Sequence, residues 1–133
     1  MTELPSGATP PATAELEGGD TLDLRTLAEE VCRHYRVEFP DEHERYGDAG
    51  VAWCVHDNQH LINWAVLEAN GYGGFEPQLA WLAGVLEARD FPLQRLARNL
   101  EIAATVVNAS SPGRRTAAAI LRDGAHLIRS RLL

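Results

Sequence analysis

The chain has 133 residues, of which 45% are apolar, and its formal net charge at pH 7 is −7. This length supports one domain with a hydrophobic core. The negative charge argues against a nucleic-acid-binding module, in which a basic face normally supplies much of the affinity. No segment approaches the roughly 18 apolar residues of a membrane span, and the first residues lack the features of a signal peptide. We therefore predict a cytoplasmic protein that binds neither nucleic acid nor membranes.

Residues 1–20 are rich in Pro and Gly and contain few large apolar side chains. Such a segment buries too little apolar surface to offset the entropy lost on ordering it. The sequence therefore predicts a disordered N-terminal tail over residues 1–20, followed by a helical-bundle domain over residues 21–133.

The first predicted helix covers about 23–37. Asp23 can cap it, and apolar residues then recur at three- and four-residue spacing as far as Tyr35. The pattern ends near Pro40, because the residue before a proline is pushed out of helical geometry. Pro40 and the acidic residues after it are typical of the first turn of a short helix.

A long helix follows over about 49–69, and Gly47 and Gly50 either separate it from the short helix or kink the two into one. This segment is apolar on nearly all sides, so we expect it at the centre of the fold. Three further helices are predicted from Pro77 to Arg89, from about Pro92 to residue 107, and after residues 112–113. No stretch alternates with period two for long enough to indicate a strand. The predicted fold is all-α, a single compact bundle of about five helices plus one short helix, with a buried central helix.

The segment 53–64 places polar side chains inside this central helix. At 100° per residue Trp53 and Trp64 point the same way, and Asp57 and His60 lie within about 40° of that direction. Asp57 and His60 are therefore expected in the interior, as an acid/base pair, as ligand contacts or as hydrogen-bonded structural groups. A narrow strip is expected to face solvent, and it holds His56, Gln59 and Asn63.

Aromatic residues gather in and after the same segment, which predicts a shared cluster. Three tryptophans at helical spacing are ordinary core residues, but they can also wall a pocket for a flat or apolar ligand between bundle helices. Polar contacts to such a ligand would come from Asp57, Asn58 and His60. The predicted ligand-binding residues are Trp53, Asp57, Asn58, His60, Trp64 and Trp81.

A metal site is a further hypothesis. His56 and His60 are one helical turn apart, and Glu30 and His34 repeat this spacing, so the four can meet if the first two long helices are antiparallel neighbours. Over these four residues the chain resembles four-helix non-haem iron proteins. Those proteins draw ligands from all four helices, whereas the later helices here hold one histidine, His126, and few carboxylates.

Cys32 and Cys54 fall within apolar helical segments and lack the spacing of metal ligands. We predict two buried reduced thiols, with a disulfide between them as the alternative. Charge is also uneven along the chain, because residues 23–48 are acidic and residues 113–133 are basic. The two segments either attract each other weakly across the fold or form a docking surface for a charged partner or a second copy.

No nucleophile with a matching base, no phosphate-binding glycine loop and no Cys-x-x-Cys motif is present. A binding protein is therefore favoured over an enzyme, and the sequence indicates no particular cofactor. The preferred hypothesis is a small regulatory module that acts through protein–protein interaction or self-association. The alternative is a ligand- or metal-binding bundle with its pocket around Trp53, Asp57, His60 and Trp64.

Overall fold

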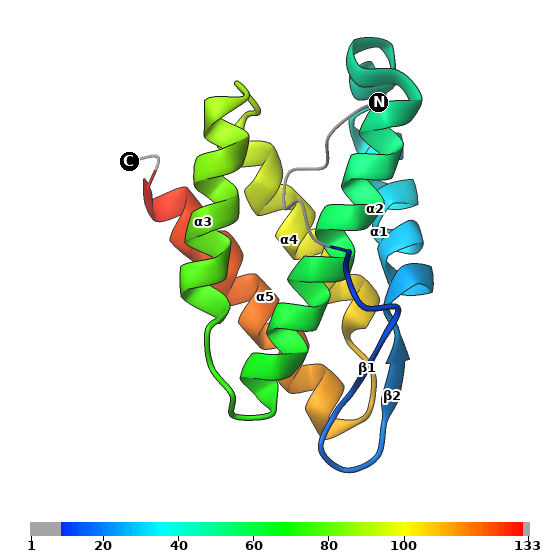
Figure 1. Ribbon diagram of the computed structural model, residues 1–133, viewed down its shortest axis with the longest axis vertical. Helices are drawn as coiled ribbons and strands as arrows, with labels where there is room; N and C mark the ends of the chain where they lie inside the picture. The colour runs from blue at the N-terminus through cyan, green and yellow to red at the C-terminus, as the bar shows by residue number, and fades with distance from the viewer. Residues whose placement is uncertain (1–8, 132–133) are drawn as a thin grey trace.

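The computed structural model describes residues 9–131, which form a bundle of five helices (Figure 1). The helices are α1 (Leu24–Glu38), α2 (Asp41–Ala69), α3 (Phe75–Ala88), α4 (Leu93–Val107) and α5 (Pro112–Arg131). Helix α2 contacts each of the other four, so the predicted all-α bundle with a central helix is confirmed. Within the described chain, no helix is both long and apolar enough to cross a membrane.

The helix boundaries follow the predicted signals. The side chain of Asp23 accepts a hydrogen bond of 3.0 Å from the backbone N–H of Thr26, which caps α1. Pro40 immediately precedes α2, whose first turn is acidic. Gly47 has φ 62° and ψ −150°, a conformation that only glycine adopts without strain, and it kinks α2. The predicted short helix is thus the first part of α2.

Two short strands, β1 (Thr13–Glu15) and β2 (Thr21–Asp23), pair antiparallel beside the start of α1 (Figure 1). The expectation of disorder therefore fails for residues 13–20, whereas residues 1–8 lie outside the described chain. The segment is ordered because Leu16 and Leu22 are buried in the core. Leu16 packs on the start of α5, where a Cβ added to Gly113 would lie 3.1 Å from Leu16 Cδ1. Three-residue strands show too little alternation to be recognised in the sequence.

The N-terminal segment also covers a face of α2 that was predicted to be solvated. His56 and Gln59 are only 5% and 7% exposed. Gln59 Nε2 donates a hydrogen bond of 3.2 Å to the carbonyl oxygen of Pro11. Helical periodicity places polar residues toward solvent, but it does not reveal that another part of the chain supplies their hydrogen bonds.

The acidic region of α1 and α2 is paired with α4, and no ion pair within residues 9–131 joins it to the basic C-terminal segment. Arg98 Nε lies 2.7 Å from a carboxylate oxygen of Glu38, and Arg95 binds Asp41 and Glu42. These hydrogen bonds lower the pKa of Glu38 and of Asp41, because the guanidinium groups stabilise the ionised carboxylates. The exposed pairs contribute little to stability, but they fix α4 beside the junction of α1 and α2.

Candidate functional site

A cavity of about 90 Å³ lies between the first four helices. Its walls come from α1, from the first two thirds of α2, from the end of α3 and the loop after it, and from α4. The lining is mainly apolar, as is typical of small-molecule sites. Its aliphatic wall consists of Leu61, Leu82, Leu86 and Leu96.

Aromatic side chains form another part of the lining. The rings of Tyr46 and Trp53 meet edge to face with centroids 6.0 Å apart, and the guanidinium of Arg89 lies 5.9 Å from the Trp53 ring. Trp53 Nε1 is buried and has no hydrogen-bond partner among residues 9–131. Leaving such a donor unsatisfied costs about 1–3 kcal/mol. Trp53, which lines the cavity, thus has a hydrogen-bond donor that the described chain leaves unused.

Asp57 lies one helical turn after Trp53 and also lines the cavity. Its side chain is 15% exposed, and its Oδ1 atom lies 3.4 Å from His56 Nδ1. Burial raises the pKa of Asp57, while His56, His60 and Arg89 act in the opposite direction. The expected interior position of Asp57 is confirmed, and its carboxyl group is a polar contact within an otherwise apolar wall.

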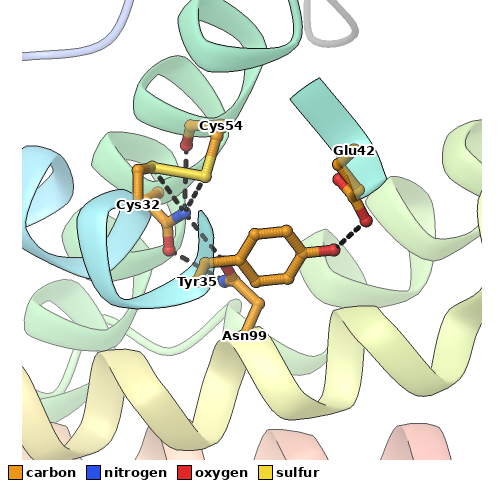
Figure 2. Close-up of a disulfide and its surroundings, with 6 residues drawn as sticks. Cys32, Tyr35, Glu42, Cys54 and Asn99 are labelled. Atoms are coloured by element: carbon orange, nitrogen blue, oxygen red, sulfur yellow. Dashed lines mark hydrogen bonds between the residues drawn. A yellow bond between two sulfur atoms is a disulfide. The ribbon is translucent and has the colours of Figure 1, made fainter. Parts of the chain in front are cut away.

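A buried pair of amides joins α2 to α4 at the side of the cavity (Figure 2). Asn58 Nδ2 donates to Asn99 Oδ1 at 3.0 Å, and Asn99 Nδ2 donates back to Asn58 Oδ1 at 2.8 Å. Asn58 Nδ2 also donates to the backbone carbonyl of Cys54 at 2.9 Å. Both donor positions of Asn58 are therefore used, and the pair fixes the register of α2 against α4.

Cys32 and Cys54 form a disulfide that joins α1 to α2 beside this amide pair (Figure 2). The prediction of two reduced thiols is therefore wrong, and the alternative holds. The two Cα atoms lie 6.0 Å apart because α1 and α2 pack side by side. The sequence could not reveal this, since the spacing of two cysteines on different helices depends on how the helices pack.

Tyr35 and Glu42 form the polar part of the lining where α1 meets the start of α2. The Tyr35 hydroxyl points at Glu42 and donates to its Oε2 (Figure 2). Arg95 Nη1 donates to the same oxygen at 2.8 Å. Burial and the neighbouring carboxylate raise the pKa of Tyr35, because both disfavour the phenolate.

The structure brings together three of the six predicted ligand residues, because Trp53, Asp57 and Asn58 all line the cavity. The other three do not. His60 is buried and lies against Trp64 with ring centroids 5.5 Å apart, and Trp81 is 46% exposed on α3. The predicted single aromatic cluster is thus wrong. The cavity ends near Leu61, beyond which aliphatic and aromatic side chains fill the space beside α2.

The four predicted metal ligands do not form a group. Glu30 and His34 are half-exposed on α1, with His34 Nε2 3.9 Å from Glu30 Oε1, whereas His56 and His60 are buried on α2. Over the described part of the chain, no three His, Cys, Asp or Glu side chains lie close enough together to hold a metal ion. Each pair has the spacing of one helical turn, but the Glu30/His34 pair on α1 does not face the His56/His60 pair on α2.

Sequence reasoning missed several residues of the site, among them Tyr35, Glu42, Leu86 and Asn99. Asn99 carried a usable signal in the sequence, because it lies three residues after Leu96 and four before Ala103, on the apolar face of its helix. The others join the site through the packing of separate helices. Comparison with known proteins found no matching family model, no similar curated protein and no similar solved structure.

Proposed function

We propose that this protein is a ligand-binding helical bundle and that the cavity between α1, α2, α3 and α4 holds a small planar molecule. The observation that carries the proposal is that Trp53, a residue that lines an apolar cavity, has a buried indole N–H without a partner in the described chain. A ligand that accepts this hydrogen bond would satisfy a donor that the protein leaves unsatisfied.

The lining restricts the chemistry of the ligand. A space of about 90 Å³ limits the buried part of the ligand to no more than about one ring. The rings of Tyr46 and Trp53 and the leucine wall favour a flat aromatic ring. Trp53 requires an acceptor and Asp57, when ionised, requires a donor. These two residues are one turn apart on α2, so the ligand should carry its acceptor and donor side by side, as in a cyclic amide.

The hypothesis of a protein-interaction module stays a prediction. Large apolar side chains that are exposed lie on four helices and on the turn after α2, and this scatter does not favour one docking face. They are Val37, Leu67, Tyr72, Trp81 and Leu127.

Binding can be tested with 2-pyridone, a single ring with a carbonyl acceptor next to an N–H donor. The probe is titrated into ¹⁵N-labelled protein while the three indole N–H resonances are followed by NMR. The Trp53 resonance is assigned by its loss in Trp53→Phe. We expect this resonance to move downfield with saturation, because its N–H gains an acceptor.

Two comparisons make this experiment specific. N-methyl-2-pyridone keeps the acceptor but lacks the donor, so it should bind more weakly than 2-pyridone, and toluene should leave the Trp53 N–H resonance without the downfield shift. Trp81→Phe, which alters an exposed indole on α3, should bind like wild type, whereas Trp53→Phe should bind more weakly. Equal shifts of all three indoles would contradict binding in the cavity.

A further inference from the structure

The two sulfur atoms of the disulfide lie in different surroundings. Cys32 is fully buried, whereas Cys54 is partly exposed and lines the ligand cavity. Cys54 also lines a second, smaller cavity of about 20 Å³, which Tyr35, Glu42 and Gly50 border as well. Of the two cysteines, Cys54 is therefore the one that an incoming thiolate can approach.

The disulfide is also connected to the polar residues of the site. Asn58 Nδ2 lies 3.4 Å from Cys54 Sγ and 3.6 Å from Cys32 Sγ, while it bonds Asn99 on α4. A change at the sulfur atoms therefore acts on an amide that fixes α2 against α4. Cys54 follows Trp53 directly in α2. Both Cys54 and Asn99, which Asn58 connects, line the same cavity as Trp53.

We propose that the Cys32–Cys54 disulfide is a redox switch for the ligand site: a dithiol reductant opens it through Cys54, and opening changes the affinity of the cavity. This inference rests on the proposed function. Two thiols need more room than a disulfide, because non-bonded sulfur atoms must separate to van der Waals contact. In the packed junction of α1 and α2, that separation moves the Cys54 side chain, which is part of the cavity wall, and displaces Asn58.

The reaction is ordinary thiol–disulfide exchange. The first thiolate of the reductant attacks Cys54 Sγ, the Cys32–Cys54 bond breaks, and Cys32 leaves as a thiolate that takes up a proton. The second thiol of the reductant, as thiolate, then attacks the reductant sulfur that is bonded to Cys54 in the mixed disulfide. This step releases the Cys54 thiolate and yields the oxidised cyclic reductant. Two electrons pass from the dithiol to the protein. If the chain resides in the cytoplasm, as the sequence predicts, such use fits the disulfides of that compartment, which are mostly catalytic or redox-sensing.

The direction of attack can be tested on the wild-type protein without any ligand. The folded, oxidised protein is treated briefly with reduced glutathione, free thiols are alkylated, and peptide mapping by mass spectrometry locates the mixed disulfide. We expect glutathione on Cys54 and the alkyl group on Cys32. Glutathione on Cys32, or equally on both, would overturn the assignment of Cys54 as the attacked sulfur.

The switch itself is tested by titrating 2-pyridone into oxidised protein and into protein reduced with dithiothreitol. We expect the dissociation constant to change by about fivefold or more, the lower range of typical allosteric coupling. As a control, the double variant Cys32→Ser/Cys54→Ser should show no effect of dithiothreitol. Unchanged affinity in a wild-type protein that binds 2-pyridone would overturn the switch and leave the proposed function intact.

If 2-pyridone does not bind, that result counts against the proposed function but does not test the switch. The switch is then tested on the ligand-free protein. The Trp53 indole resonance of the ligand-free protein should move on reduction, because Trp53 adjoins Cys54, and it should move more than the Trp81 resonance. If reduction leaves the Trp53 resonance in place, the disulfide is not coupled to the cavity, and the inference is overturned.

Discussion

The two ends of the α2–α3 pair differ in how their interior is filled. Near the C-terminus of α2 and the start of α3, the inward side chains are aliphatic or aromatic and fully packed, as at Ile62, Val66 and Leu79. Near Trp53, Asp57 and the end of α3, the interior holds polar groups, a disulfide and a cavity. In this helix pair, one end is a fully packed apolar core that stabilises the fold, and the other end encloses a cavity. Binding sites require such space, which a fully packed core does not provide.

Leucine truncations at the two ends of α3 test this difference most directly. Leu79 is fully buried away from the cavity, whereas Leu86 lies two turns later and lines it. We expect Leu79→Ala to lower the free energy of unfolding by about 4 kcal/mol and Leu86→Ala by about 2–3 kcal/mol, since the first creates a new void in a filled core. Urea unfolding measures both. A larger loss for Leu86→Ala would reverse the comparison.

The disulfide is the main covalent support of the end that holds the cavity. It closes a loop with a sequence separation of 22 residues. In the chain-entropy model a loop of this length stabilises the fold by about 3 kcal/mol. The double variant Cys32→Ser/Cys54→Ser should therefore unfold at a lower urea concentration than oxidised wild type, and dithiothreitol should lower the midpoint of the wild type alone. Identical midpoints with and without reductant would show that the disulfide adds no stability.

At the end that holds the cavity, the Asn58–Asn99 amide pair joins α2 to α4 by hydrogen bonds, whereas apolar packing joins the helices at the other end. Asn58→Ala should cost about 2 kcal/mol, since it leaves the buried amide of Asn99 without its partner. The double variant Asn58→Ala/Asn99→Ala should cost less than the sum of the losses in Asn58→Ala and Asn99→Ala. A double-mutant cycle by urea unfolding gives the coupling energy, and additive losses would mean that the two amides act independently.

The smallest effect concerns the pH dependence that Asp57 contributes. Burial raises its pKa in the folded protein above 3.8, so the folded state binds the proton more tightly than the unfolded chain. Asp57 therefore reduces stability progressively as the pH rises from 3.8 through the folded-state pKa. Relative to wild type, Asp57→Asn should gain stability as the pH rises above 3.8, as measured by urea unfolding. The matched variant Asp123→Asn, at an exposed carboxylate on α5, should show no such gain, and parallel profiles for Asp57→Asn and wild type would refute the assignment.

The helices were accessible to sequence reasoning because their signals are local. The cap at Asp23, the proline at position 40 and the glycine at position 47 each act within a few residues, and the structure places helix ends or a kink at all three. The interior position of Asp57 follows from the periodicity of one helix. The hairpin was missed because its order comes from the burial of Leu16 and Leu22 against distant helices.

The site was less accessible because its residues meet through tertiary packing. Trp53, Asp57 and Asn58 share one helix, so their phase could be worked out, whereas Tyr35, Leu86 and Asn99 join them from three others. The disulfide depends in the same way on the distance between α1 and α2. Trp64 has nearly the helical phase of Trp53, yet it lies past the end of the cavity, and position along the helix axis cannot be deduced from periodicity.

The hairpin has a consequence for the order in which the chain folds. Its hydrogen bonds to other parts of the protein span long separations: 53 and 55 residues for the contacts of Glu17 and Glu15 with Asn70, and 91 residues for the contact of Ser111 with Asp20. Such contacts form only after the intervening chain has been closed into a loop, which slows folding. Although the hairpin precedes every helix in the sequence, we expect it to reach its final position late, after α2 and the start of α5 have assembled the surface on which it rests.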